Sequence, residues 1–190
     1  MDDRVAQPDD IPELVERARN GDAESFARLY RHYLTPIYRF LYWRVKNRED
    51  ADDLAQTVFT KAWNAIPSLQ KEGNHFTAWL YTIARNAAMD YWRKKKEVLF
   101  DIPEAIEGRM DPAPDTAMDA VERAEGASIL RKALGVLNDD QQEIIILRFF
   151  EEMSNKEISN ITGKTEAAIR QIQCRALKMM RDFCKQRKIL

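Results

Sequence analysis

Glycine and proline are scarce in this chain, and long apolar runs are missing. With 6 Gly and 7 Pro among 190 residues, the sequence has few of the tight turns that a β-rich architecture needs, so we predict an all-α protein. No apolar stretch approaches the roughly 20 residues that cross a bilayer, and residues 1–10 are acidic where a secretory signal is basic and then apolar. We therefore expect no membrane insertion and a cytoplasmic location.

Cysteine and histidine are also rare, and their spacing matches no common metal site. Cys174 and Cys184 form no CxxC pair, and His32 and His75 have no companions at ligand spacing. We predict no metal, no cofactor and no disulfide, and we interpret Cys174 as a small packing residue rather than a redox switch. No nucleophile and base cluster or phosphate-binding glycine loop stands out, so an enzyme is the least favoured class.

Charge is segregated along the chain, although the formal net charge is only -1. Acidic residues concentrate in residues 2–16 and 101–125, whereas basic residues gather in residues 93–96 and 164–188. Basic clusters are the usual phosphate-contacting surfaces of nucleic-acid-binding proteins, and a global sum hides them. The sequence therefore predicts two DNA-contacting regions on either side of an acidic segment.

The first half of the chain has the pattern of a small helical bundle. Apolar residues recur at helical spacing in four stretches: residues 11–18, 26–41, 51–62 and 76–87. The run Asn20-Gly21-Asp22 predicts the end of one helix and the N-cap of the next, and Pro36 predicts a kink or a break. Four such helices bury one core without a sheet, so we predict a domain over residues 1–96.

An acidic segment and a second helical block follow. Between residues 97 and 126 the periodicity weakens, and the run Asp111-Pro112-Ala113-Pro114-Asp115 cannot be helical throughout, so we interpret residues 97–126 as a linker. The second block predicts another small helical domain over residues 127–190. Its expected helices cover residues 129–137, 139–150, 155–162 and 165–187.

The last two of these helices have the pattern of a helix-turn-helix. Ser154-Asn155-Lys156-Glu157 is a capping box, Gly163 stands where the first helix must end, and Thr165 is suited as the N-cap of the second. The alternative is an amphipathic helix whose charges only keep it soluble, but Gly163 at the turn favours DNA binding. We expect the second helix to bury Ala168, Ile169, Ile172, Ala176 and Leu177.

The exposed side chains of this helix-turn-helix are of the types that contact base edges and phosphates in a major groove. The candidates are Lys164, Thr165, Glu166, Arg170, Gln171, Gln173, Arg175 and Lys178. Arg181 and Lys185, further along, are suited to backbone phosphates. A regulator that binds operator DNA alone is the rival hypothesis, although no sensing domain is visible.

Two motifs stand out in the first domain. One is Asp50-Ala51-Asp52-Asp53-Leu54-Ala55-Gln56-Thr57-Val58-Phe59-Thr60-Lys61-Ala62-Trp63. The other is Phe76-Thr77-Ala78-Trp79-Leu80-Tyr81-Thr82-Ile83-Ala84-Arg85-Asn86, followed by Asp90 and basic residues. Together with the helix-turn-helix, they resemble the bacterial sigma factor family, specifically its extracytoplasmic-function class, over nearly the whole chain. The first motif is similar to the family's polymerase-binding helix, and the second to its promoter-melting segment.

The resemblance implies a partner for each region: core RNA polymerase for the first motif, the minus-ten promoter element for the fourth helix and the loop before it, and the minus-thirty-five element for the helix-turn-helix. Many family members carry Glu where this chain has Thr57, so one ionic contact to the polymerase is missing here. The implied polymerase-binding residues are Asp50, Asp52, Asp53, Gln56 and Thr57. The implied minus-ten residues are Asn74, His75, Tyr81, Arg85, Met89, Trp92, Arg93, Lys94, Lys95 and Lys96.

Several of these residues also have a purely structural interpretation. Asn74 and His75 are suited to hold unstacked bases, but a loop that is polar only because it faces water explains them equally well, and the same choice applies to Tyr81 and Trp92. The basic run 93–96 also suits a helix C-terminus, where the helix dipole favours cations. We interpret two further tryptophans on the apolar stripes as core residues: Trp63 and Trp79.

The resemblance extends to the acidic linker and to regulation. It implies that the linker enters the RNA channel of polymerase through residues 101–119, the alternative being a solvated tether. It also implies control by an anti-sigma factor. We predict an initiation factor that directs promoter recognition, DNA melting and transcription initiation and catalyses no reaction itself.

Overall fold

The computed structural model describes residues 10–69, 76–99 and 129–187, and every secondary-structure element in these ranges is a helix. The predicted all-α class is therefore confirmed. The chain divides into two compact units, Met1–Arg109 and Met110–Leu190. Asn74, His75 and residues 100–126 of the expected linker lie outside the described residues.

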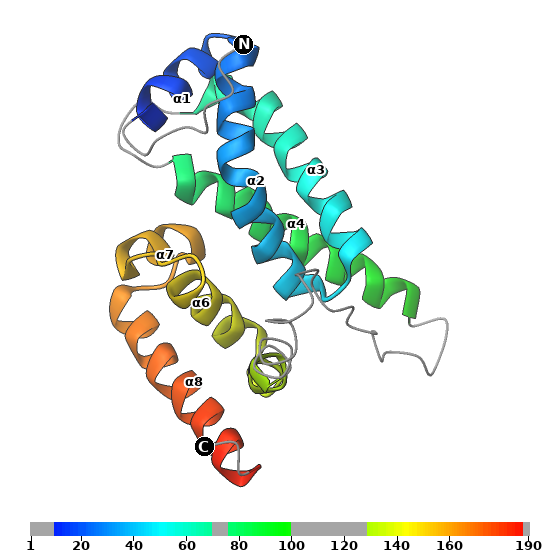
Figure 1. The fold of residues 1–190 in the computed structure, drawn as a ribbon, viewed down its shortest axis with the longest axis vertical. Coiled ribbons are helices and arrows are strands. Elements are labelled where there is room, and N and C mark those ends of the chain that lie inside the picture. The colour runs from blue at the N-terminus through cyan, green and yellow to red at the C-terminus, as the bar shows by residue number, and fades with distance from the viewer. Residues whose placement is uncertain (1–9, 70–75, 100–128, 188–190) are drawn as a thin grey trace, which may run out of the picture. The chain divides into compact units, whose positions relative to one another are not determined.

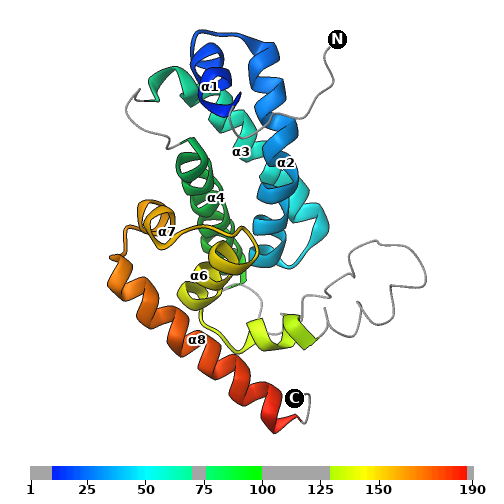
Figure 2. The same cartoon turned by 60° about the vertical axis from the view of Figure 1, so that its left-hand side comes forward.

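The N-terminal unit is built from the four predicted amphipathic stretches. They form α1 (Ile11–Arg19), α2 (Ala23–Val45), α3 (Arg48–Ala65) and α4 (Phe76–Leu99), with a short 3-10 helix η2 (Ile66–Ser68) after α3. The long helix α2 packs against α1, α3 and α4, and α3 also packs against α4 (Figures 1 and 2). The buried centre contains Leu29, Ile37, Phe40, Leu41, Leu80 and Tyr81.

Helix α2 continues through Pro36, so of the two predicted alternatives, a kink or a break, the break is wrong. A proline inside a helix removes one backbone N–H donor and crowds the preceding turn. Here Tyr33 and Ile37 on either side of Pro36 are buried, as is Phe40 one turn later. These buried contacts hold the helix together where local preference favours interruption.

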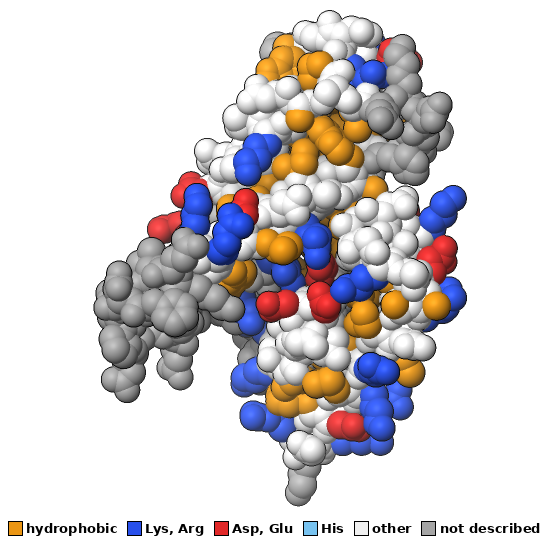
Figure 3. Space-filling view, turned by 180° about the vertical axis from the view of Figure 1, so that it is seen from behind, with side chains coloured by type: hydrophobic (Ala, Val, Ile, Leu, Met, Phe, Trp, Pro, Cys, Tyr) orange, Lys and Arg blue, Asp and Glu red, His pale blue; other side chains and the backbone are white. Residues whose placement is uncertain are grey.

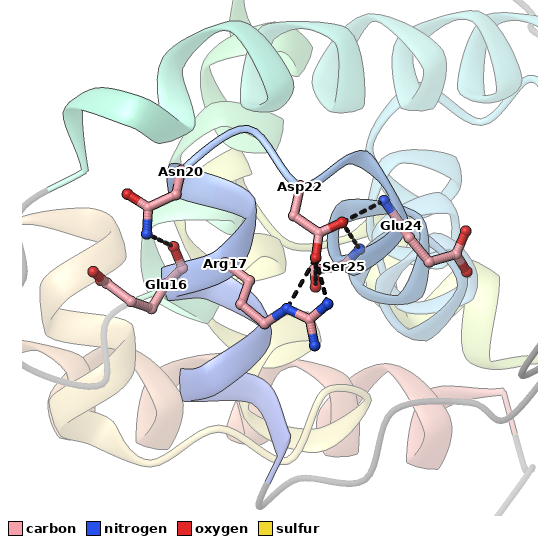
Figure 4. Close-up of polar contacts among 6 residues, drawn as sticks. All are labelled: Glu16, Arg17, Asn20, Asp22, Glu24 and Ser25. Atoms are coloured by element: carbon pink, nitrogen blue, oxygen red, sulfur yellow. Dashed lines mark hydrogen bonds and ion pairs between the residues drawn. The ribbon is translucent and has the colours of Figure 1, made fainter.

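The turn between α1 and α2 is organised by the carboxylate of Asp22, the predicted N-cap. It accepts hydrogen bonds from the backbone N–H groups of Glu24 and Ser25 at 3.1 and 3.3 Å, and from the Ser25 hydroxyl at 2.8 Å. The guanidinium of Arg17 on α1 lies 2.7 Å from the same carboxylate (Figure 4). The hydrogen bonds from Ser25 and then Arg17 lower the pKa of Asp22.

This lowered pKa predicts a specific loss of stability in acid. Because the folded pKa lies below the unfolded one, the carboxylate stabilises the fold above about pH 4 and ceases to do so as pH falls through the folded value. Asp22→Asn keeps an N-cap side chain but removes the charge, so we expect the variant to melt below the wild type at neutral pH. Thermal unfolding followed by circular dichroism should show the two melting temperatures converging in acid. A difference independent of pH would contradict this assignment.

The C-terminal unit consists of a helical segment over residues 129–135 followed by α6 (Asp139–Phe149), α7 (Asn155–Thr162) and α8 (Glu166–Gln186). The buried side-chain amide of Gln142 donates to the carbonyl of Leu134 at 2.8 Å, which ties α6 to the end of the preceding segment. Helix α8 packs against both α6 and α7 (Figure 1). Their shared core contains Ile144, Ile145, Leu147, Ile158, Ile161 and Ile169.

The turn between α7 and α8 has the local structure that the sequence predicts. Ser154 and Glu157 form a complete capping box at the start of α7. Gly163 ends α7 with φ 71° in the left-handed region, and the Thr165 hydroxyl accepts from the backbone N–H of Ala168 at 3.2 Å. A side chain disfavours such a φ by roughly 1–2 kcal/mol, which explains glycine at this position.

Two glycines among the described residues of this unit, Gly163 and Gly135, therefore predict opposite effects of one substitution. A Cβ at Gly163 or at Gly135 meets nothing within 4 Å, so only the backbone conformation distinguishes the two sites. We expect Gly163→Ala to lower the free energy of unfolding by about 1 kcal/mol. Gly135→Ala, in the helical segment without a positive φ, should raise it by about 0.5 kcal/mol. Urea unfolding measures both, and the same sign for both would contradict the backbone explanation.

Candidate functional site

The first candidate surface lies on α3. Its members Asp52, Asp53, Gln56 and Thr57 are exposed, as a docking surface requires, and we call them the α3 acidic surface. Asp50, in the first turn of the same helix, is only half-buried and already has a partner, because the Tyr91 hydroxyl donates to its carboxylate at 2.6 Å. Four of the five implied polymerase-binding residues are thus exposed on the same helix.

The flank of the α3 acidic surface includes Tyr38 of α2. Burial raises the pKa of the Tyr38 hydroxyl, and the charge of Asp52 adds to the increase while Arg48 opposes it. The phenol therefore stays neutral near Asp52 at physiological pH. Its ring stacks on Tyr42 one turn later, with 6.1 Å between ring centroids. An aromatic group accordingly borders the carboxylates of α3.

The candidate minus-ten residues on α4 separate into buried and exposed positions. Tyr81 is 2% exposed, and its ring packs edge-on against Phe40 with centroids 5.4 Å apart. Its inclusion among the DNA-contacting residues is therefore wrong. Helix α4 packs on both α2 and α3, so more of its surface is buried than the apolar spacing in the sequence indicates. Met89, in contrast, is 48% exposed. Arg85 is half-buried.

The C-terminal part of α4 is attached to the rest of the bundle by two aromatic residues. The indole N–H of Trp92 donates to the backbone carbonyl of Arg44 at 3.1 Å, and the Tyr91 hydroxyl donates to Asp50. Tyr91 is not among the residues that the sequence motifs indicate, although it lies one helical turn before Lys95 on the same face. Trp92 thus has the structural role that was one of its two interpretations.

The basic run at this end of α4 is not uniform. Arg93 and Lys94 are exposed, and Arg93 pairs with Asp90 at 2.9 Å. Lys95 is half-buried, and its ammonium donates to the Tyr91 hydroxyl at 2.7 Å. The side chain of Lys96 lies outside the described residues.

The second candidate surface is the outward face of α8. Arg170, Gln171, Arg175 and Lys178 are exposed, and Arg170 forms only a loose ion pair with Glu166 at 3.7 Å. We call these four residues the α8 basic face. The space-filling view shows Lys and Arg side chains gathered over the lower part of the molecule (Figure 3). The geometry provides cations and amides along one helix, which is the chemistry that DNA grooves and phosphates bind.

Three other candidates of the helix-turn-helix have partners inside the unit. The Gln173 amide donates to Asn155 at 2.9 Å and so joins α8 to the start of α7, and Lys164 pairs with Asp140 on α6 at 2.9 Å. The Thr165 hydroxyl caps α8. These side chains position the α8 basic face in addition to any contact of their own.

Two expectations for α8 are wrong. Leu177 is 40% exposed rather than buried, and Cys174 is exposed, so it is not a packing residue. The buried positions of α8 are Ile169 and Ala176, while Ala168 and Ile172 are half-buried. The two tryptophans interpreted as core are also half-buried, with Trp63 packed on Phe26 at 4.9 Å and Trp79 on Phe76 at 5.6 Å between ring centroids.

Within the described residues, no group of three or more His, Cys, Asp or Glu side chains is arranged to hold a metal ion. None of the described helices combines the length and the apolar character that a bilayer crossing needs.

Comparisons with known proteins assign both units. The family model of Sigma-70 region 2 matches residues 29–98, and that of Sigma-70 region 4 matches residues 133–182. The chain is 36% identical to the ECF RNA polymerase sigma factor BldN of Streptomyces coelicolor, over 88% of this chain and 63% of BldN. It is 32% identical to the RNA polymerase sigma factor YlaC of Bacillus subtilis, over 86% of this chain and 95% of YlaC.

A solved structure agrees with these sequence relatives. The sigma factor RpoE from Bartonella quintana, in complex with the anti-sigma factor NepR, is 26% identical with a TM-score of 0.70, over 86% of this chain and 98% of that one. The region 2 match includes α3 and all but the last residue of α4, and the region 4 match includes α6 and α7 and most of α8. The chain belongs to the sigma-70 family of RNA polymerase sigma factors, in its extracytoplasmic-function class.

Proposed function

We propose that this sigma factor binds core RNA polymerase and directs promoter recognition, DNA melting and transcription initiation. The α3 acidic surface docks on the polymerase, the exposed part of α4 contacts the minus-ten element, and the α8 basic face binds the minus-thirty-five element. The observation that carries the proposal is the presence, in one chain of this family, of an exposed acidic helix and a separate helix-turn-helix with an exposed basic helix. The chain acts in the cytoplasm and catalyses no reaction itself.

Two further parts of the proposal concern the linker and regulation. The acidic residues between 101 and 119 enter the RNA channel of polymerase, because their negative charge resembles that of a nucleic-acid strand. An anti-sigma factor holds the chain inactive, and the relative RpoE, solved with NepR, supports this proposal.

Transcription from a promoter pool tests the main proposal. Purified chain is mixed with Bacillus subtilis core RNA polymerase and linear duplexes of randomised upstream sequence, and the RNA products are sequenced. We expect transcripts that depend on the chain and start downstream of two conserved elements. The same polymerase without the chain provides the background.

The rival hypothesis predicts a different result in the same experiment. A regulator that binds operator DNA alone should select duplexes in the absence of polymerase, and its addition should not create new start sites. A chain that selects DNA by itself and leaves core polymerase at background would therefore overturn the proposed function. The two exposed charged surfaces can then be examined one at a time by substitution.

A further inference from the structure

A three-residue network joins the first turn of α3 to the end of α4. The Tyr91 hydroxyl donates to the Asp50 carboxylate at 2.6 Å, and the Lys95 ammonium donates to the same hydroxyl at 2.7 Å. The ammonium also lies over two rings, 5.1 Å from the centroid of Tyr91 and 5.5 Å from that of Trp92. Asp50 and Tyr91 are 41 residues apart in sequence, so the contact is a product of the fold.

The chemistry of the hydroxyl gives the network a direction. A phenol has one proton to donate and lone pairs that accept. Because the proton is directed to Asp50, the lone pairs are left for Lys95, whose ammonium can only donate. Burial and the hydrogen bond to Asp50 raise the pKa of Tyr91. The phenol therefore keeps its proton throughout the physiological range, and Asp50 orients it.

The position of Lys95 follows from these contacts. A free lysine side chain samples many rotamers, and ordering it on binding costs affinity. Here one of the three ammonium donors is used by Tyr91, and the two rings attract the cation without using a donor. Two donors are left for a phosphate. The neighbouring Lys94 is exposed, whereas Lys95 is half-buried.

We propose that Tyr91 is a positioning residue for promoter DNA: oriented by Asp50, its hydroxyl holds the Lys95 ammonium ready for a backbone phosphate near the minus-ten element. The inference rests on the proposed function and adds to it a residue that contacts no DNA itself. It also links the first turn of the polymerase-docking helix to the DNA-contacting end of α4. A substitution at Tyr91 therefore acts on DNA binding through Lys95.

A double-substitution cycle tests this route. Tyr91→Phe removes only the hydroxyl, Lys95→Gln removes the cation, and both are assembled with core polymerase on a fluorescent duplex recovered from the promoter pool. We expect Tyr91→Phe to weaken promoter binding by about 3- to 10-fold, because the Lys95 side chain then loses conformational entropy when it binds the phosphate. The double variant should bind no more weakly than Lys95→Gln alone. The magnitude of the slope of log affinity against log salt concentration should decrease by about 0.7 to 0.9 for Lys95→Gln. For Tyr91→Phe it should decrease by a smaller amount.

Lys94→Gln is the matched control, because it removes an adjacent exposed lysine while Lys95 keeps its hydrogen bond to the Tyr91 hydroxyl. Its effect should add to that of Tyr91→Phe. Additive effects of Tyr91→Phe and Lys95→Gln, or unchanged binding by Tyr91→Phe, would overturn the inference. Thermal unfolding of each variant distinguishes a specific loss of promoter binding from a loss of the folded structure. Promoter binding by the wild-type holoenzyme in the same assay tests the proposed function. A wrong proposed function is therefore distinguishable from a wrong role for Tyr91.

Discussion

Phe40→Ala is expected to lower the free energy of unfolding of the N-terminal unit by about 3–5 kcal/mol, a large share of the 5–15 kcal/mol typical of a domain. Phe40 is 0% exposed in the C-terminal part of α2, and its ring packs edge-on against Tyr81 of α4. Truncation removes buried apolar area and leaves a cavity where α2 and α4 meet. Urea unfolding of the full chain, followed by circular dichroism, measures the loss.

Phe149→Ala provides the control for removal of a phenyl ring. Phe149 is 53% exposed at the end of α6 in the other unit, so its truncation should change stability by no more than about 0.5 kcal/mol. Phe40→Ala should also leave the transition of the C-terminal unit in place if the units unfold separately. A loss below about 1 kcal/mol for Phe40→Ala would mean that the ring is not packed as the structure shows.

Helix ends are the part of this fold that the sequence predicts best. The N-caps Asp22 and Ser154 and the terminating Gly163 are all found where the sequence places them. A cap depends on one side chain and on backbone groups two or three residues away, so the information is local. Helix α7 consequently has the predicted bounds, and the other helices begin and end close to their predicted residues.

Burial is predicted less well because it depends on what covers each helix. In α8, Leu177 is exposed although Ala176 beside it is fully buried and Gln141 of α6 contacts Met179 further along the helix. Leu177 therefore lies beside the covered face of α8, not beyond its end. The opposite happens at Tyr81, which two neighbouring helices bury. Periodicity indicates the apolar face of a helix, but not how wide or how long the covered face is.

The candidate site shows the same limit. The sequence identifies the residue types of the α3 acidic surface and of the α8 basic face from charge and motif. It does not show which polar side chains already have hydrogen-bond partners, because Asp50 with Tyr91 and Asn155 with Gln173 are brought together only by packing of separate helices. Residues that position others are therefore harder to find from sequence than residues that face outward.

Arg170→Ala should produce the largest single loss of promoter recognition within the α8 basic face. Arg170 lies near the N-terminus of α8, the part of a recognition helix that enters the major groove, and its ion pair with Glu166 is a loose one at 3.7 Å. An arginine bidentate to a guanine contributes about 1–3 kcal/mol of discrimination, which is roughly 5- to 150-fold in affinity. Holoenzyme binding to the selected promoter, and to versions altered at each base pair of the minus-thirty-five element, measures both affinity and base preference.

Lys185→Ala is the comparison that separates base recognition from phosphate attraction. Lys185 is exposed on the same helix, about 22 Å further along at the helical rise of 1.5 Å per residue. Its loss should leave base preference unchanged and alter, at most, the salt dependence of binding. Arg170→Ala, in contrast, should relax the preference at one base position while the others keep theirs. If Arg170→Ala weakened binding equally at every sequence, Arg170 would be a phosphate contact, and the base-reading role of the first turns of α8 would have to be assigned to Gln171 or Arg175.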